Sequence, residues 1–308
     1  MKQLRIGTRG SALALWQANH VRDLLLKSHG VEVELVRIRT SGDHLQTASV
    51  AQIGTIGVFT KELEEALLSE TVDLAVHSMK DVPTETPRGL AIPAITKRED
   101  VRDCLVSRES RKLKDLPVGA CIGTSSLRRK AQILHFRPDL QVVNLRGNVD
   151  TRLAKVAAGE LDAVVLALAG VMRLGAVDKV SEILETDVML PAVGQGALGI
   201  ETRASDRDTW KFVSFLNDPE TRSCVRAERA LLRELQGGCQ VPLGAWARID
   251  KEEILLEACV FSPDGKEFAR RELRGAPSDP LALGRSLGQI LIEAGADRML
   301  RLAGRSIG

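Results

Sequence analysis

The chain has 308 residues, of which 44% are hydrophobic and 27% are charged, and its formal net charge is +2. This composition is that of a folded globular protein, which excludes disordered and membrane-spanning classes, and the small net charge gives no support to nucleic-acid binding. The N-terminus MKQLRIGTRG enters a strand pattern without a secretory hydrophobic region. We therefore expect a cytoplasmic protein that makes no membrane contact.

The first part of the chain alternates strand and helix patterns. In order, the pattern predicts a strand at 4–8, a helix at 11–25 that Ser11 caps, a strand at 31–38 and a long loop at 40–57. A helix at 58–70 and a strand at 72–78 follow. The second hundred residues repeat this plan. A strand at 120–124 ends in the same Ile-Gly-Thr as the first strand, and a helix to 134, a strand at 140–147, a helix at 149–158 and a strand at 161–170 follow.

The repeat predicts two similar α/β domains that are joined near residues 96–104. Alternation of strands and helices favours a mainly parallel sheet in each domain, and such sheets bind ligands at the carboxyl ends of their strands. Both Ile-Gly-Thr turns are expected at that edge. We therefore look for binding residues directly after the predicted strands.

The chain pattern changes after about residue 217. It predicts a helix at 223–235 that stops at a glycine pair, and then strands at 241–249, 253–261 and 266–273, with the hairpin turn SPDG between the last two strands. A long final helix is predicted at 279–300. This is a third, α+β domain. Its loop LQGGCQVPLG exposes Cys239, one of five widely spaced cysteines that indicate neither a disulfide nor a metal site. From the residues alone, Cys239 is either a packed structural thiol or a reactive one.

Several arginines fall at the predicted junctions of strand and helix. They are Arg9, Arg128, Arg129, Arg146, Arg152 and Arg173. Helix N-termini favour anions and guanidinium groups pair with carboxylates, so these positions predict a ligand with several negative charges. The alternative is that each arginine is a solvated surface charge.

One acid follows a strand among these bases. Asp81 comes just after the strand that contains His77, in HSMKDVP. A carboxylate there could stabilise a developing cation or exchange a proton, although a simple Asx turn before Val82 and Pro83 would explain it equally well. We expect His77 to be a packed or hydrogen-bonded strand residue.

Six ordered segments carry a resemblance to a known family. GTRGSALALWQ, DLAVHSMKDVP, GTSSLRR, LRGNVDTRL, LPAVGQGALGIE and GGCQVPLG together closely resemble the porphobilinogen deaminases, or hydroxymethylbilane synthases, over almost the whole chain. The resemblance implies an enzyme of tetrapyrrole (haem) biosynthesis that condenses four porphobilinogen molecules head to tail and releases ammonia at each step. It also implies two domains like type II periplasmic binding proteins and a smaller α+β domain, at residues 1–96 with 197–216, 102–196 and 217–308.

The resemblance assigns roles to residues of this chain. Cys239 would hold a dipyrromethane cofactor, built from substrate, through a thioether bond, and Asp81 would bind pyrrole N–H groups and stabilise the cation left when ammonia departs. The other cofactor-binding residues would be Lys80, Thr124, Ser125, Ser126, Arg128, Arg129, Arg146 and Gly170. Substrate would be bound by Arg9, Ser11, Arg146, Arg152, Arg173 and Gln195. No metal is implied, and we expect a monomer.

By the resemblance, the long loop at about 42–57 is a lid, and it departs from the family pattern, since Gln52 and Ile56 stand where many relatives have lysines. This puts lid contacts with substrate carboxylates in doubt. Two other classes stay open on the residues themselves. A two-lobed anion-binding protein without catalysis would share the architecture but needs neither Asp81 nor Cys239, and a cysteine hydrolase would need a histidine base, whereas no histidine lies beyond residue 135.

Overall fold

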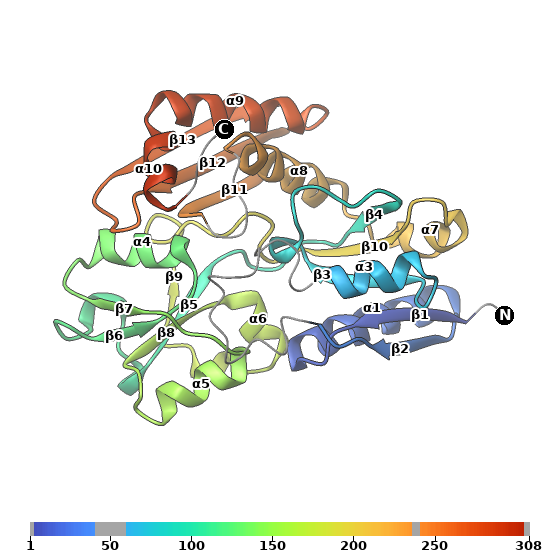
Figure 1. The fold of residues 1–308 in the computed structure, drawn as a ribbon, viewed down its shortest axis with the longest axis horizontal. Coiled ribbons are helices and arrows are strands. Elements are labelled where there is room, and N and C mark those ends of the chain that lie inside the picture. Colours follow the sequence, from blue (N-terminus) through green and yellow to red (C-terminus); the bar gives the residue numbers. More distant parts are fainter. Residues whose placement is uncertain (1–2, 41–59, 236–240, 305–308) are drawn as a thin grey trace. The chain divides into compact units, whose positions relative to one another are not determined.

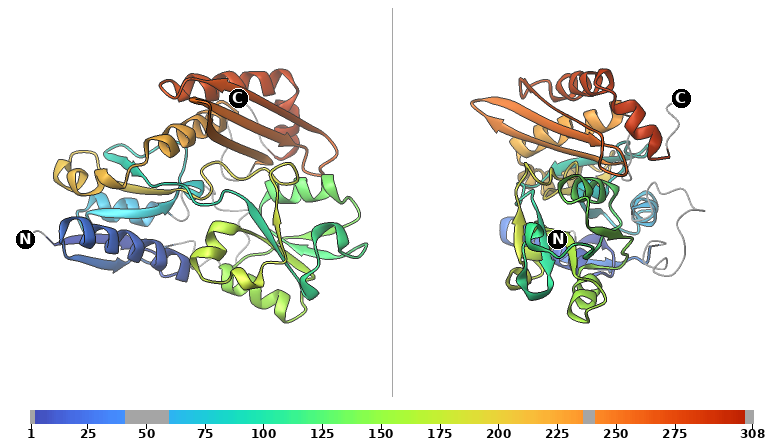
Figure 2. Two further views of the ribbon diagram at one scale, coloured as in Figure 1. Left: turned by 180° about the vertical axis from the view of Figure 1, so that it is seen from behind. Right: turned by 90° about the vertical axis from the view of Figure 1, so that its left-hand side faces the viewer.

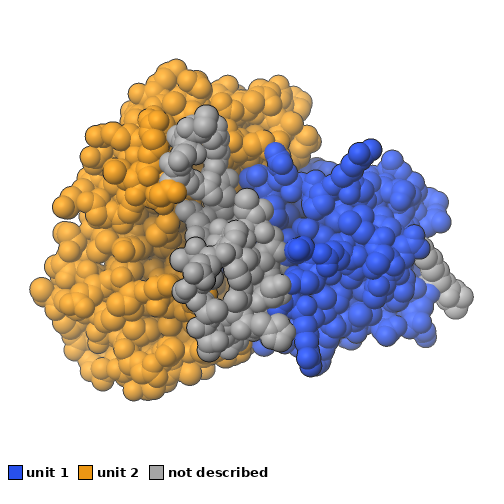
Figure 3. Space-filling model, viewed as in Figure 1, with its two compact units in different colours: residues 1–99, 197–222 blue, residues 100–196, 223–308 orange. Residues whose placement is uncertain are grey.

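The computed structural model describes residues 3–40, 60–235 and 241–304. The predicted lid loop at about 42–57 and Cys239 therefore lie outside the described residues. The chain divides into two compact units, Met1–Glu99 with Ala197–Arg222 and Asp100–Gly196 with Ser223–Gly308 (Figure 3). The predicted second and third domains both fall largely in the second unit, so their boundaries stay a prediction. Among the described helices, none is long and apolar enough to cross a membrane.

The first unit is built on a five-stranded sheet with the order β2-β1-β3-β10-β4 (Figure 1). Its strands are β1 (Leu4–Thr8), β2 (Val33–Arg37), β3 (Leu74–Ser78), β4 (Leu90–Ile95) and β10 (Leu198–Arg203). β1 is parallel to β2 and β3, whereas β10 is antiparallel to both β3 and β4. The chain thus returns to this sheet after residue 197, as the family resemblance implied.

Helices cover both faces of this sheet. They are α1 (Ala12–His29), α3 (Lys61–Leu68) and α7 (Arg207–Val213). Alternate residues of β3 divide between the faces, since Leu74 and Val76 pack in one core with α1 and Ala75 packs in the other with α3. The predicted cap of α1 is confirmed, because the Ser11 hydroxyl accepts a hydrogen bond from the Ala14 amide.

The second unit contains a sheet of the same design, with the order β7-β6-β8-β5-β9. Its strands are β5 (Asp103–Ser107), β6 (Cys121–Gly123), β7 (Gln141–Val143), β8 (Ala163–Ala167) and β9 (Glu182–Leu184). β6 is parallel to β7 and β8, and β5 is antiparallel to β8 and β9. Its helices are α4 (Leu127–Phe136), α5 (Val149–Ala157) and α6 (Leu168–Arg173).

The internal repeat is visible in single hydrogen bonds as well as in strand order. In the first sheet, Asp73 accepts a hydrogen bond from the Arg5 amide at 2.9 Å, and in the second sheet Asp162 accepts one from the Cys121 amide at 2.8 Å. In both sheets the fourth strand is antiparallel and the others run in one direction. The prediction of two similar, mainly parallel α/β domains is confirmed.

A separate three-stranded antiparallel sheet follows in the second unit. It consists of β11 (Leu243–Asp250), β12 (Glu253–Phe261) and β13 (Phe268–Gly275) and packs with α8 (Pro219–Glu234), α9 (Pro280–Glu293) and α10 (Ala296–Leu302). Helix α9 lies across one face of this sheet (Figure 2). The prediction of one final helix at 279–300 is wrong, because Gly295 adopts a left-handed φ of +89° and separates α9 from α10.

Two predicted strands are shorter than expected. The strand predicted at 161–170 ends at Ala167, because α6 begins at Leu168. Of the strand predicted at 140–147, only β7 forms. A continuous apolar run does not distinguish a buried strand from a buried helix, which explains the first error. Short 3-10 turns also occur at Met79–Asp81, Arg108–Ser110, Leu113–Asp115, Val177–Lys179 and Ser214–Leu216.

The hairpin between β12 and β13 packs directly on α4. Ala131 of α4 shares a hydrophobic core with Cys259 and Phe261 of β12. The His135 ring nitrogen Nδ1 lies 2.9 Å from the Gly265 carbonyl oxygen. Gly265 has a φ of +73°, and a Cβ atom built on it would lie 2.7 Å from the His135 amide nitrogen. The hairpin and the helix therefore meet without room for a side chain at this glycine.

Candidate active site

The predicted binding residues of the second unit gather at one edge of its sheet. The parallel strands β6, β7 and β8 end at Gly123, Val143 and Ala167. The residues that follow these ends are Thr124, Ser125, Ser126, Arg128, Arg129, Arg146, Arg152, Gly170 and Arg173. Because parallel strands point their carboxyl ends to the same edge, the topology brings these residues together.

Hydrogen bonds between side chains and the backbone order the start of α4. The Thr124 hydroxyl accepts a hydrogen bond from the Ser126 amide at 3.2 Å, and the Ser126 hydroxyl caps the helix by accepting one from the Arg129 amide. Ser125 is exposed beside them. Arg128 and Arg129 occupy the first turn of α4, where the helix dipole favours an anion.

A buried carboxylate, which the sequence did not predict, lies between these two arginines. Asp103, the first residue of β5, is fully buried. Its carboxylate oxygens accept hydrogen bonds at 2.7 Å from Arg128 Nη1 and at 2.7 Å from Arg129 Nη2. Burial alone would raise the pKa of Asp103, but the charges and hydrogen bonds of the two arginines hold it well below its usual range.

The same cluster engages a residue that was predicted to bind substrate. Gln195 is buried, and its Nε2 donates to the Val101 carbonyl oxygen at 2.7 Å and to Asp103 Oδ1 at 3.0 Å. The Gln195 side chain thus helps to hold Asp103 in place. Its contact with substrate stays a prediction. The sequence signal for the cluster was an acid at the start of an otherwise apolar strand, DCLVS.

The other three arginines of this edge are half-buried, and backbone carbonyls hold two of them. Arg152 lies in the first turns of α5, and its Nε donates to the Gly147 oxygen at 2.9 Å. Arg173 is the last residue of α6, so its predicted place at a strand–helix junction is wrong by one short helix, and its Nη2 donates to the Gly196 oxygen at 2.8 Å. Arg146 lies between β7 and α5, and Gly170 is buried within α6.

In the first unit, the predicted residues also follow the carboxyl ends of parallel strands. Arg9 and Ser11 come directly after β1. Lys80 and Asp81 lie in the 3-10 turn Met79–Asp81 after β3, where the Asp81 side chain is exposed. This turn is tied to the residue before β10, because the Met79 amide donates to the Ala197 oxygen at 3.0 Å.

His77 has the structural role expected of it. Its Nε2 lies 2.9 Å from Glu201 Oε2, and both side chains are buried between β3 and β10. Burial also raises the pKa of the Glu64 carboxyl on α3, which lies on the same face of the sheet. His77 is thus a hydrogen-bonded strand residue, as predicted.

Four cysteines lie among the described residues, and three of them are buried. Cys104 and Cys259 are buried, and burial raises the pKa of each thiol to about 12. Cys224 is also buried, and partial burial raises the pKa of Cys121. Because the thiolate is the reactive form, the raised pKa values disfavour reaction at Cys104, Cys121 and Cys259 near neutral pH.

Comparisons with known proteins cover nearly the whole chain. Residues 4–211 match the family model "Porphobilinogen deaminase, dipyromethane cofactor binding domain", and residues 222–293 match "Porphobilinogen deaminase, C-terminal domain". The porphobilinogen deaminase of Pelobacter propionicus is 51% identical over 99% of this chain and 96% of its own. That of Chlorobaculum tepidum is 50% identical over 97% of each chain.

Solved structures resemble part of this chain at low sequence identity. The methionine-binding protein MetQ is 12% identical and covers 70% of this chain and 89% of its own, with a TM-score of 0.44. A periplasmic substrate-binding protein of an ABC transporter from Coxiella burnetii is 14% identical and covers 73% of this chain and 96% of its own, with a TM-score of 0.43.

Proposed function

The chain belongs to the porphobilinogen deaminase family, and we propose that it is a hydroxymethylbilane synthase that condenses four porphobilinogen molecules into a linear tetrapyrrole. Each condensation forms a carbon–carbon bond between the aminomethyl carbon of one porphobilinogen and the free α-carbon of the preceding pyrrole ring. Ammonia leaves from the first carbon and a proton from the second. The observation that carries the proposal is about 50% identity to porphobilinogen deaminases over nearly the full length of both chains.

The cofactor of this family is a dipyrromethane, and the residues present fit it. When bound, the dipyrromethane supplies the pyrrole ring to which the first substrate is added. Cys239 is the residue we assign to the thioether, because the four described cysteines are protonated or buried thiols and Cys239 stands in the glycine-rich segment GGCQVPLG. The dipyrromethane carries carboxylate side chains, and the start of α4 offers two guanidinium groups with buried Nε atoms that have no hydrogen-bond partner among the described residues.

The residues of the second unit bind and orient carboxylates in this proposal. Arg128 and Arg129, with Thr124, Ser125 and Ser126, hold those of the cofactor. Guanidinium groups suit this task because they stay charged and pair with carboxylates in a fixed, bidentate geometry. Arg146, Arg152 and Arg173 are assigned to the carboxylates of incoming substrate and the growing chain, with Arg9 and Ser11 of the first unit.

Asp81 is the residue to which we assign the chemistry. Its exposed carboxylate lies on a short turn whose first residue, Met79, is buried. The Met79 amide donates a hydrogen bond to the oxygen of Ala197, the residue before β10. A carboxylate held in this way can accept hydrogen bonds from pyrrole N–H groups and stabilise the positive charge that develops when ammonia leaves. Lys80, its neighbour, is assigned to cofactor binding. A non-catalytic anion-binding protein would not need this carboxylate.

The mass of the denatured protein tests the proposal. Protein produced with porphobilinogen available should be heavier than the chain by one dipyrromethane, and the adduct should be absent from Cys239→Ala. The wild-type protein should consume porphobilinogen and release ammonia, whereas Cys239→Ala should do neither. An unmodified, inactive wild-type protein, or an active Cys239→Ala variant, would contradict the assignment. The cytoplasmic location and the monomeric state stay predictions.

A further inference from the structure

The cluster around Asp103 combines three charged groups in a buried place. Asp103 is 0% exposed, Arg128 is 4% exposed and Arg129 is 6% exposed. Besides Asp103, the guanidinium groups donate to neutral acceptors, since Arg128 Nη1 lies 2.8 Å from the Leu190 oxygen and Arg129 Nη1 lies 2.9 Å from the Val165 oxygen. Such a cluster is costly unless its charges are compensated.

The charges of this cluster do not balance. Two guanidinium groups share one carboxylate, and among the described residues Asp103 is the acid that pairs with either arginine. The Nε atoms of Arg128 and Arg129 are buried without a hydrogen-bond partner in the described part of the chain. Burial and the charge of Arg129 lower the pKa of Arg128, against the effect of Asp103. The cluster therefore carries one positive charge in excess.

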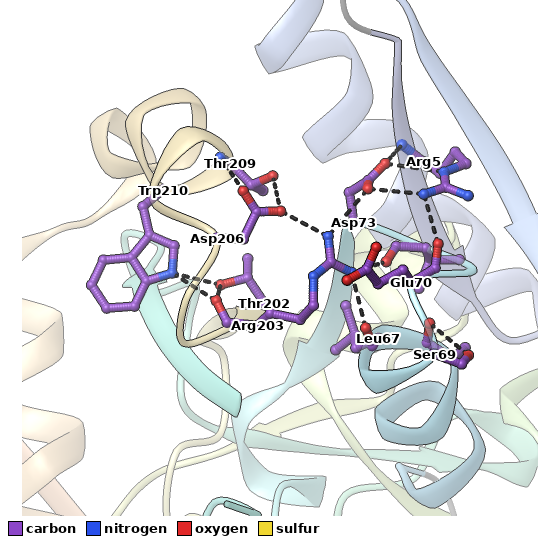
Figure 4. Close-up of polar contacts among 12 residues, drawn as sticks. Arg5, Leu67, Ser69, Glu70, Asp73, Thr202, Arg203, Asp206, Thr209 and Trp210 are labelled. Carbon is purple, nitrogen blue, oxygen red and sulfur yellow. Dashed lines mark hydrogen bonds and ion pairs between the residues drawn. The ribbon is translucent and has the colours of Figure 1, made fainter. Parts of the chain in front are cut away.

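A second cluster, in the first unit, shows what a balanced arrangement looks like (Figure 4). There Asp73 pairs with Arg5 at 3.0 Å and with Arg203 at 3.4 Å, so it too is one carboxylate between two arginines. However, Arg203 also pairs with Asp206 at 2.8 Å, which gives two acids for two bases. The Asp73 cluster is more exposed, since the Arg5 side chain is 37% exposed, yet it has the second carboxylate that the buried Asp103 cluster lacks.

We propose that Asp103 is a positioning residue that fixes both guanidinium groups and limits the charge of their cluster to that of one ligand carboxylate. The inference rests on the proposed function, in which this carboxylate belongs to the dipyrromethane. With two bound acids the arginines would be saturated, and with none they would repel each other and lose their common orientation. With Asp103 in place, both guanidinium groups keep their orientation, and the cluster carries a net charge of +1 that one ligand carboxylate would neutralise.

The substitution Asp103→Asn removes the charge and changes the geometry. The side-chain amide has one oxygen to accept a hydrogen bond, and its NH₂ group would face the second guanidinium donor. At least one arginine should then leave its position. If the lost orientation costs the bound carboxylate about 2 kcal/mol, covalent loading should slow roughly 30-fold, since 1.4 kcal/mol corresponds to about tenfold.

The test uses full-length apo-protein that is produced without a supply of porphobilinogen. Porphobilinogen is then added, and the fraction with covalent dipyrromethane is followed by intact mass, normalised to the folded fraction from circular dichroism. The matched control is Asp73→Asn, which removes a similarly shared carboxylate from the balanced cluster. We expect both variants to lose stability, but only Asp103→Asn to load roughly 30-fold more slowly than wild type.

Loading of Asp103→Asn at the wild-type rate, or equal slowing of both variants, would overturn the inference and leave the proposed function intact. No adduct on wild-type protein would overturn both. If Asp103→Asn does not fold, Asp103→Glu decides the matter, because it keeps the charge but moves the carboxylate by one methylene group. Slower loading of folded Asp103→Glu supports the positioning role, and loading at the wild-type rate overturns it.

Discussion

Gly265 packs the C-terminal hairpin against the backbone of the arginine-bearing helix α4, and Gly265→Ala should destabilise the protein more than an ordinary glycine substitution. A non-glycine residue at its φ of +73° costs about 1–2 kcal/mol. The added Cβ would also meet backbone atoms, namely the Ala131 oxygen, the His135 nitrogen at 2.7 Å and the Leu134 carbonyl carbon at 3.1 Å. Such overpacking adds about 1–3 kcal/mol, because a helix backbone cannot yield as a flexible side chain does. The expected loss is roughly 2–5 kcal/mol in the free energy of unfolding, a large part of the total stability of a typical domain.

Gly119→Ala separates the two contributions. Gly119 has nearly the same φ, +78°, but a Cβ there would meet nothing within 4 Å. Denaturant unfolding monitored by circular dichroism should therefore show a loss of only about 1–2 kcal/mol for this control. Because α4 carries Arg128 and Arg129 in its first turn, Gly265→Ala should also load less dipyrromethane than Gly119→Ala does. Equal destabilisation by the two substitutions would refute the argument that the hairpin and the helix are in tight contact.

Three further predictions concern charged side chains. Asp81→Asn should keep its fold and its covalent cofactor but lose turnover by about 100- to 1000-fold, as measured by porphobilinogen consumption, and turnover within a few-fold of wild type would remove Asp81 from the chemistry. Arg128→Leu or Arg129→Leu should be recovered mainly as apo-protein, whereas Arg173→Leu should carry the cofactor and stall during elongation. Intact mass before and after addition of porphobilinogen distinguishes these outcomes, and normal loading and elongation of all three would show that these arginines bind neither the cofactor nor the growing chain. Finally, the lowered pKa of Asp103 contributes stability above the unfolded pKa of about 4, and this contribution falls as the pH drops below that value. Unfolding measured between pH 5 and pH 2 should therefore be less pH-dependent in Asp103→Asn, and identical profiles would contradict this.

The sequence predicted those features that depend on neighbouring residues. The cap at Ser11, the strand–helix order and the repeated Ile-Gly-Thr turns follow from local patterns, and the structure confirms them. The repeat also placed most of the candidate binding residues just after the carboxyl ends of strands. Local patterns failed where one apolar run contains two elements, as at Ala167 and Leu168, and where a single glycine, Gly295, interrupts a helical period.

The features that escaped prediction depend on residues far apart in the chain. Asp103 reaches Arg128 across 25 positions and Gln195 across 92, and no sequence period connects these three residues. Likewise, the pairing of Asp73 with Arg203 spans 130 positions. Charged groups are commonly solvated, so a sequence read alone treats each as a surface charge until the fold brings its partner to it.

The place of β10 in the first sheet fixes the order in which a ribosome can complete the two sheets. All strands of the second sheet lie between Asp103 and Leu184, so that sheet can form as one continuous stretch of nascent chain. The first sheet waits longer, because β10 separates β3 from β4 and begins only at Leu198, whereas β4 ends at Ile95. At roughly 5–20 residues per second, the intervening stretch of about 100 residues takes on the order of 5 to 20 s to synthesise. Throughout that interval β4 has no neighbouring strand, and the turn that carries Asp81 lacks its hydrogen bond to Ala197. Asp81, to which we assign the chemistry, therefore gains this support only after all strands of the second sheet have been made.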